Sequence, residues 1–193
     1  MHCKNFYEET AKIAKMLDFS IVERMVDELV SLKKRDGRLF ILGVGGSAGN
    51  AGHAVNDFRK LCGIETYAPT DNVSELTART NDEGWTNVFL NWLKTSKLSK
   101  NDTLLIFSVG GGDAEKNISV NLINSIDYAC SLNCCVIGVV GRDGGHTKKF
   151  GSHVVVIPTI DPVHVTPQSE SFQAIIWHSI VSHPKLQVNP TTW

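Results

Sequence analysis

The fold is decided by the stretch Leu39-Phe-Ile-Leu-Gly-Val-Gly-Gly-Ser-Ala-Gly-Asn-Ala-Gly-His53-Ala-Val-Asn-Asp57. Its apolar start predicts a buried strand and its end predicts a helix, with a glycine-rich turn between them. Gly43, Gly45 and Gly46 allow a sharp turn and a close approach of the backbone to a ligand. The unpaired N–H groups of the first helical turn favour an anion, so we expect this loop to bind an oxyanion such as phosphate, with Ser47 capping the helix.

The helix after the glycine turn carries His53 and Asp57, four residues apart. Side chains at this spacing lie on one face of a helix, so the imidazole and the carboxylate are placed to share a metal ion or a proton. The alternative is a histidine that a neighbouring carboxylate orients on a solvated face.

A second pair of candidate ligands, Glu170 and His178, lies on the last predicted helix. These residues are two turns apart and offset by about 80° around the helix axis, which long side chains can bridge. The alternative is an exposed glutamate and a histidine that packs beside Trp177. If all four side chains meet, they form a site of two imidazoles and two carboxylates that suits zinc, and manganese or iron(II) accepts the same ligand types.

Length and composition predict one compact domain over residues 1–193 with an ordinary core, because 42% of the residues are hydrophobic. The formal net charge of −1 provides no basic excess for nucleic acid or anionic lipid, so a small molecule is the expected partner. No apolar run reaches the roughly 20 residues of a membrane span, and the first residues lack a signal-peptide core. We therefore expect a cytoplasmic protein without a membrane partner. The five cysteines lack a Cys-x-x-Cys spacing and are expected to be reduced thiols.

Strands and helices alternate along the chain, which predicts an α/β fold with a parallel sheet flanked by helices. The expected strands are uniformly apolar, as buried parallel strands are, and a weaker fifth strand covers 64–68. The strongly apolar runs are Arg38–Val44, Thr103–Val109, Cys134–Val140 and His153–Thr159. The expected helices are Ser47–Lys60, Gly84–Thr95, Asp113–Leu132 and Gln168–Ser182.

One or two leading helices within residues 1–36 precede the core of residues 37–183, and an irregular tail covers 184–193. No strand comes before the leading helices, so their apolar faces must pack on the sheet or on a neighbouring subunit. Ligands of such a sheet bind beyond the carboxyl ends of its strands, where this chain places the loops Ser108–Asp113, Gly141–Gly145 and Thr159–His164. Their backbone donors are expected to surround one crevice.

A nucleotide site is an alternative for the first loop. Gly43-x-Gly45-x-x-Ala48 matches the dinucleotide fingerprint, and Glu65 lies near the distance at which an acid binds a ribose. However, Glu65 falls inside the weak second strand, and the chain has no room for a separate substrate domain.

Several landmarks in fixed order resemble the SIS (sugar isomerase) domain family, and more closely the phosphoheptose isomerases. They span nearly the whole chain and comprise Gly43–Ser47, the pair His53 and Asp57, Asn81-Asp-Glu-Gly84, Gly141-Arg-Asp-Gly-Gly145 and His178. The resemblance implies a flavodoxin-like sheet of five parallel strands, a cytoplasmic and commonly tetrameric enzyme, and conversion of sedoheptulose 7-phosphate to the aldose heptose 7-phosphate. The resemblance further implies that the product feeds an activated heptose for surface glycans or secondary metabolites.

The resemblance also implies roles for individual residues. The zinc ligands are expected at His53, Asp57, Glu170 and His178. Asp57 is expected to remove the C1 proton and His178 to return one through a cis-enediol, while the metal steadies the oxyanion. The expected substrate contacts are Gly45, Gly46, Ser47, Asp82, Ser108, Gly110, Gly111 and Asp113.

Four features depart from the family pattern. Asp57 replaces a glutamate, Glu170 replaces a glutamine, and Pro167 replaces an acidic substrate contact. The loop Ser108–Asp113 is glycine-rich where the family has hydroxyl groups, and Asp113 adds a negative charge to the start of the predicted helix. A phosphate there needs backbone N–H groups and a cation, for which Arg59 and Lys60 are candidates. A different class of function is a non-catalytic SIS module that binds a sugar phosphate and regulates a partner.

Overall fold

The apolar runs of the sequence form the central sheet of the molecule, which the computed structural model describes over residues 1–191. All four neighbouring pairs of strands are parallel, and the strand order is β2-β1-β3-β4-β5, the flavodoxin-like order. The strands are β1 (Leu39–Leu42), β2 (Thr66–Tyr67), β3 (Thr103–Ser108), β4 (Cys135–Val140) and β5 (His153–Val156). The predicted α/β fold with a five-stranded parallel sheet is therefore confirmed, including its weak fifth strand.

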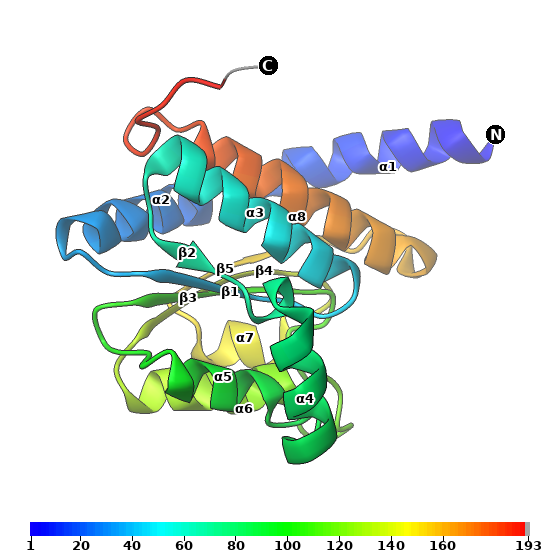
Figure 1. Cartoon of the computed structure of the whole chain (residues 1–193). Coiled ribbons are helices and arrows are strands. Elements are labelled where there is room, and N and C mark those ends of the chain that lie inside the picture. The colour runs from blue at the N-terminus through cyan, green and yellow to red at the C-terminus, as the bar shows by residue number, and fades with distance from the viewer. Residues whose placement is uncertain (192–193) are drawn as a thin grey trace.

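Helices cover both faces of the sheet (Figure 1). One layer consists of α1 (His2–Met16), α2 (Phe19–Lys34), α3 (Gly46–Cys62) and α8 (Val165–Val181). The opposite layer consists of α5 (Val88–Thr95), α6 (Val120–Ser131) and α7 (Gly145–Phe150), with α4 (Val73–Glu83) beside it. Two short 3-10 helices, η1 (Pro69–Asp71) and η2 (Pro162–His164), follow β2 and β5.

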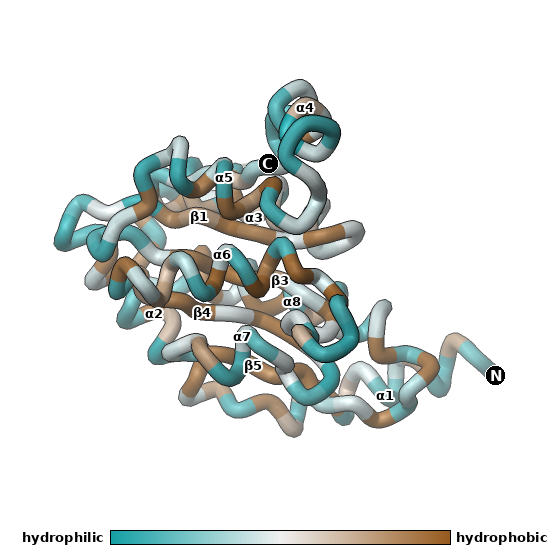
Figure 2. Tube along the Cα trace, turned by 90° about the horizontal axis from the view of Figure 1, so that it is seen from below, coloured by the Kyte–Doolittle hydropathy of each residue, from teal (hydrophilic) through white to brown (hydrophobic). Residues whose placement is uncertain are grey.

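The sheet separates two hydrophobic clusters, and the side chains of β3 alternate between them. Leu105 and Phe107 belong to the cluster under α2, α3 and α8, whereas Leu104 and Ile106 belong to the cluster under α5 and α6. Figure 2 shows the hydrophobic strands passing behind the helices of the second layer. Because both faces of the sheet are covered, the strands are uniformly apolar.

The sixth helix is shorter than predicted. The sequence predicts a helix from Asp113, but α6 begins at Val120. Asp113 and Ile118 form an antiparallel bridge, and the backbone is left-handed at Asn117 and Ser119 (φ 54° at each). Asp113 therefore closes a turn, in which its side chain accepts hydrogen bonds from the next N–H groups, and does not cap the helix.

Two helices were not expected from the sequence. The helix α4 buries none of its residues and therefore lacks the apolar stripe by which a sequence predicts a helix. The helix α7 has only six residues, too few to show a helical period. The helix predicted from Gly84 begins at Val88.

The leading segment forms two helices that separate at Leu17. Asp18 caps the start of α2, because its carboxylate accepts a hydrogen bond from the N–H of Ser20 (3.0 Å). The helix α2 packs its buried face on the sheet, whereas α1 extends beyond the body of the molecule (Figure 1). Tyr7 on α1 is 72% exposed.

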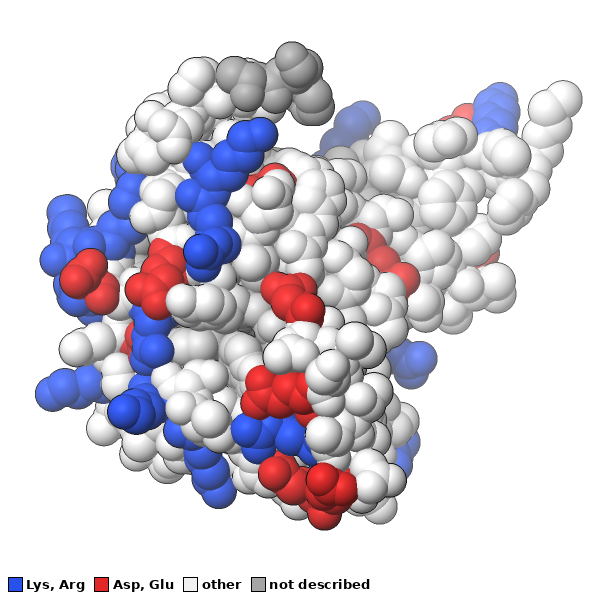
Figure 3. Space-filling view, viewed as in Figure 1, with Lys and Arg blue, Asp and Glu red and all other residues white. Residues whose placement is uncertain are grey.

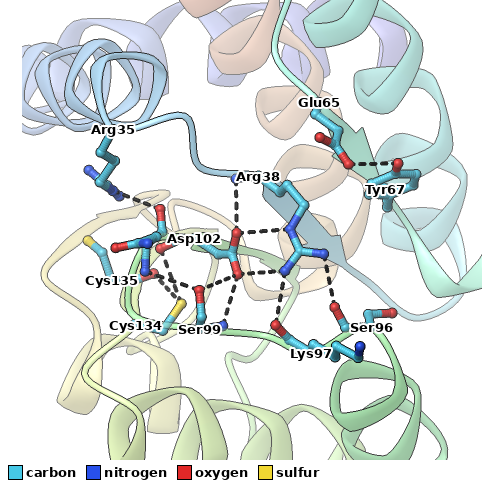
Figure 4. Close-up of polar contacts among 11 residues, drawn as sticks. Arg35, Arg38, Glu65, Tyr67, Ser96, Lys97, Ser99, Asp102, Cys134 and Cys135 are labelled. Atoms are coloured by element: carbon cyan, nitrogen blue, oxygen red, sulfur yellow. Dashed lines mark hydrogen bonds and ion pairs between the residues drawn. The ribbon is translucent and has the colours of Figure 1, made fainter.

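An ion pair ties together the amino ends of β1 and β3 (Figure 4). The guanidinium of Arg38 donates to both carboxylate oxygens of Asp102 (3.1 and 2.9 Å) and also to the carbonyl oxygens of Ser96 and Lys97. Asp102 additionally accepts hydrogen bonds from the N–H and the hydroxyl of Ser99. Burial raises the pKa of Asp102, but the hydrogen bonds from Arg38 and Ser99 outweigh burial and hold the pKa below its ordinary value.

Within residues 1–191, none of the helices has the length and apolar character that crossing a bilayer requires. On the face shown in Figure 3, acidic side chains gather over α4, and lysines and arginines gather where α2 ends. All five cysteines are free thiols, and burial raises the pKa of Cys134 to about 12.

Candidate active site

The glycine turn leads the chain from β1 directly into α3. A Cβ on Gly43 would collide with the backbone carbonyl of Ser47, and Gly45 has a φ of 64°, so both positions require glycine. Gly45 occupies the capping position of α3. The prediction that Ser47 caps the helix is therefore wrong, because the turn is too short and Ser47 already lies inside the first helical turn.

Buried polar contacts hold α3 against α8. The hydroxyl of Ser47 accepts a hydrogen bond from Gln173 Nε2 (3.0 Å), and Asn50 Nδ2 donates to Gln173 Oε1 (2.8 Å) and to the Glu170 carbonyl oxygen (2.9 Å). Ser47 and Gln173 are both buried. These contacts fix the register of the two helices and thereby decide which side chains meet further along them.

Three of the predicted ligands meet where α3 and α8 lie side by side. Asp57 Oδ2 lies 3.4 Å from His178 Nε2 and 3.6 Å from His53 Nε2. The side chain of Asp57 is 12% exposed, whereas those of His53 and His178 are 56% and 51% exposed. One ligand atom from each residue lies within 4.8 Å of the others. We call His53, Asp57 and His178 the HDH group. Its two nitrogen atoms and one oxygen atom fit a single metal ion.

Glu170 does not join the HDH group. Its carboxylate lies against Gly46, where a Cβ would collide with it, at the first turn of α3. Glu170 and His178 are eight residues apart, which separates them by about 12 Å along α8. The structure therefore brings together three of the four predicted metal ligands and leaves the fourth beside the glycine turn.

A cavity of about 940 Å³ lies at the carboxyl ends of the central strands. Ser108, Gly110 and Asp113 line it from the loop after β3, and Arg142 lines it from the loop after β4. This is the end of a parallel sheet at which ligands bind. Gly111 does not line the cavity. It is buried, has a φ of 71°, and lies so close to the Gly144 carbonyl that a Cβ would collide with it.

The polar groups of the loop after β3 are already paired with one another. The Ser108 hydroxyl accepts a hydrogen bond from the N–H of Gly111 (3.0 Å), and Lys116 Nζ contacts Asp113 Oδ2 (2.9 Å). This contact and the N–H groups of the turn hold the pKa of Asp113 below its ordinary value. The charge of Asp113 is therefore offset by Lys116.

Arg142 lines the cavity but was not predicted as a ligand contact, although it lies in the predicted ligand-binding loop Gly141–Gly145. Its backbone is left-handed, with a φ of 53°, which is uncommon for a residue with a side chain. Its side chain lies along Gly110, and Arg142 Nε is 3.9 Å from the point where a Cβ on Gly110 would stand. The left-handed backbone thus carries a cation to the mouth of the glycine loop.

The other cations and acids expected at the site lie elsewhere. Arg59 donates to the Thr66 carbonyl oxygen at the far end of α3, and neither Arg59 nor Lys60 lines the cavity. Asp82 is exposed on α4, where it accepts a hydrogen bond from Asn81, and does not line the cavity.

The nucleotide alternative fails on the position of Glu65. Glu65 precedes β2 at the amino end of the sheet, and its carboxylate accepts a hydrogen bond from the Tyr67 hydroxyl (2.8 Å). An acid that binds a ribose must lie at the carboxyl end, beside the glycine turn.

The chain is similar to known sugar isomerases over nearly its whole length. It is 29% identical over 184 residues to the phosphoheptose isomerase of Aliarcobacter butzleri, and the alignment covers 92% of each chain. It is 32% identical over 158 residues to the lincomycin biosynthesis protein LmbN of Streptomyces lincolnensis, which covers 76% of this chain and 56% of LmbN. No family model matches the chain.

The solved phosphoheptose isomerase of Neisseria gonorrhoeae has the same fold. It superposes with a TM-score of 0.78 at 22% identity, over 93% of this chain and 95% of that one. The predicted SIS-type fold and the predicted resemblance to phosphoheptose isomerases are both confirmed. The relatives named phosphoheptose isomerase also confirm the expected relationship to sugar-phosphate isomerases, which are enzymes.

Proposed function

We propose that this chain is a metal-dependent aldose–ketose isomerase that converts sedoheptulose 7-phosphate, or a closely related long-chain ketose phosphate, to the aldose heptose 7-phosphate through a cis-enediol. The observation that carries the proposal is the HDH group, in which a nearly buried carboxylate faces two half-exposed imidazoles. The relatives named phosphoheptose isomerase support the choice of reaction.

The acid–base chemistry belongs to Asp57 and His178. Isomerisation moves a proton from C1 to C2 of the sugar and exchanges protons on the two oxygens, so it needs a base and a second proton carrier beside neighbouring carbons. Asp57 and His178 face each other across 3.4 Å, which lets both reach adjacent atoms of one ligand. Asp57 removes the C1 proton with the carboxylate oxygen that the metal leaves free. His178 delivers a proton to C2 or to the oxygens through Nδ1, because an imidazole nitrogen bound to a metal carries no proton.

His53, Asp57 and His178 are the proposed metal ligands. Atoms that share a tetrahedral zinc ion at about 2.1 Å stand about 3.4 Å apart, close to the 3.4 and 3.6 Å from Asp57 Oδ2 to the two imidazoles. Three protein ligands leave a position open for a substrate oxygen, which fits the separate location of Glu170. When bound, zinc, or manganese or iron(II) in its place, supplies a Lewis acid for negative charge on the substrate oxygens.

The phosphate is proposed to bind in the cavity at the carboxyl ends of the strands, on Ser108, Gly110 and Arg142. The Glu170 carboxylate already lies against Gly46, and it disfavours a second anion on Gly45, Gly46 and Ser47. His53, Asp57 and His178 do not line the cavity itself. The substrate must therefore be long enough to reach from the cavity to the HDH group, which favours a long-chain sugar over a triose.

The half-exposed imidazoles also favour an assembly. We propose a homo-oligomer, on the pattern of a tetramer, in which a second copy shields the open side of the HDH group. We place the enzyme in the cytoplasm, where its product would feed activated heptoses for surface glycans or secondary metabolites. The similarity to a protein named for lincomycin biosynthesis supports the second of these uses.

The test is turnover of sedoheptulose 7-phosphate in deuterated water by protein loaded with Zn²⁺. We expect the aldose heptose 7-phosphate to form with deuterium at C2, as measured by NMR and mass spectrometry. The matched control is Asp57→Asn, which keeps the shape of the side chain and removes the base. Binding of the ketose phosphate without turnover would instead favour the non-catalytic SIS module.

A further inference from the structure

Trp177 is in direct contact with every member of the HDH group. Its indole N–H donates a hydrogen bond to Asp57 Oδ2 (3.1 Å). Its ring lies 5.3 Å from the ring of His53 and 4.7 Å from the ring of His178, between centroids. The other carboxylate oxygen of Asp57 accepts a hydrogen bond from the side chain of Asn56 (3.1 Å).

The direction of this indole N–H is set by the core. Trp177 is 1% exposed, and its ring packs against Phe107 of β3 at 5.8 Å between centroids. A buried indole needs one hydrogen-bond acceptor, and here the acceptor is the oxygen that also faces both imidazoles. The sheet therefore fixes the position of the Asp57 carboxylate through the indole.

We propose that Trp177 is a positioning residue that holds Asp57 and the two imidazoles in the arrangement a metal ion requires, and so sets the metal affinity of the HDH group. A free aspartate side chain adopts several rotamers, and the hydrogen bond from Trp177 removes this freedom before an ion arrives. Outer groups that orient metal ligands typically contribute 10- to 100-fold to affinity. This inference rests on the proposed metal site but not on the proposed substrate.

The test compares Zn²⁺ binding by the wild type and by Trp177→Phe, using calorimetry or competition with a chromophoric chelator. Phenylalanine keeps a ring against Phe107 and the imidazoles but has no N–H. We expect Zn²⁺ affinity to fall 10- to 100-fold, with any loss of packing visible separately as a lower Tm of the metal-free protein. The matched control is Trp92→Phe, whose ring contacts Phe40 at 5.6 Å on the opposite face of the sheet and whose zinc affinity should match the wild type.

A second measurement needs no substitution at Trp177. In wild-type protein with ¹⁵N-labelled indoles, the Trp177 N–H signal should shift when Zn²⁺ is added, while the signal of Trp92 stays in place. The signals are assigned by replacing the other tryptophans one at a time. An unmoved Trp177 signal would overturn the proposal even if Trp177→Phe does not fold.

The outcomes also separate this inference from the proposed function. Equal Zn²⁺ affinity in folded Trp177→Phe and wild type would overturn the positioning role and leave the isomerase proposal intact. Reduced affinity in the variant, with no turnover by the wild type, would support the positioning role and count against the isomerase. A wild type that does not bind Zn²⁺ would overturn both the metal site and the role of Trp177.

Discussion

At the scale of single residues, Asp57 has the most demanding surroundings in the candidate site. Its Oδ2 atom accepts a hydrogen bond from an indole and faces two imidazoles, so the loss of its charge affects three neighbours together. Arg142 is the corresponding residue at the other end, where an uncommon backbone conformation carries a cation over the glycine loop.

For Asp57→Asn, we expect kcat for the ketose phosphate to fall by about 10² to 10⁴, the usual contribution of a general base. The amide oxygen can still accept the indole hydrogen bond, so the Tm should stay close to that of the wild type. Initial rates of aldose formation and a thermal melt measure the two effects. Activity within tenfold of the wild type would exclude Asp57 as the base.

For Arg142→Ala and Arg142→Gly, we expect KM to rise by about 10-fold or more with little change in kcat, because a charge-assisted contact to phosphate contributes about 1.5 to 3 kcal/mol. The two variants should differ in stability. Because residue 142 has a φ of 53°, the Arg142→Gly protein should be more stable than the Arg142→Ala protein by about 1 kcal/mol. Kinetics and urea unfolding separate binding from backbone strain, and an unchanged KM in both variants would remove Arg142 from the phosphate site.

At the scale of helices and strands, the sequence predicts the buried elements better than the exposed ones. The strands were found because both faces of the sheet are covered and their residues are uniformly apolar. The start of α6 was misplaced because the left-handed Ser119 gives no apolar signal, and α4 was missed because it buries no residue. His53 and Asp57 were paired from their spacing, whereas the position of Glu170 depends on the register of α3 against α8, which Gln173 and Asn50 fix through contacts that no periodicity shows.

The ion pair that joins the amino ends of β1 and β3 should make stability depend on pH. The pKa of Asp102 is lowered in the folded state, so its contribution is complete above the unfolded value of about 4 and is lost as the pH falls through the folded value. We expect Asp102→Asn to reduce the free energy of unfolding at pH 7 by about 3 kcal/mol, the low end for a broken buried pair. Urea unfolding at pH 7 and at pH 3 should show this difference shrinking at the lower pH.

The matched control for Asp102 is Asp27→Asn. Asp27 is paired with Lys185, but both side chains are more than half exposed, so this variant should behave like the wild type at both pH values. A difference at Asp102 that stays constant with pH would contradict the assigned cause.

At the scale of the whole molecule, the first layer of helices is incompletely covered. The helix α1 extends beyond the body of the molecule (Figure 1), and its Tyr7 is exposed. The two imidazoles of the HDH group on α3 and α8 are half exposed. The alternation of strands and helices predicted a parallel sheet, whereas its flavodoxin-like strand order was predicted only through the resemblance to the SIS family. Assembly was predicted from the leading helices and from the family resemblance, but the sequence of one chain does not show which apolar face contacts another copy.

We expect the wild type to be a homo-oligomer and Tyr7→Glu to have a smaller mass by size-exclusion chromatography with light scattering, because a charge cannot be buried against an apolar neighbour. The control is Val73→Glu on α4, where Val73 is 68% exposed and the mass should not change. A monomeric wild type would contradict the proposed assembly.

The sheet also separates the HDH group from the helices that follow the two glycine loops. The residues proposed to move protons lie on α3 and α8 in one layer. The two glycine loops that line much of the cavity, after β3 and β4, lead into α6 and α7 in the other layer. Each layer has its own hydrophobic cluster, so a change in one loop leaves the packing of the opposite layer intact. We therefore expect substitutions in the loops after β3 and β4 to change which anionic group is bound without disturbing the arrangement of the HDH group.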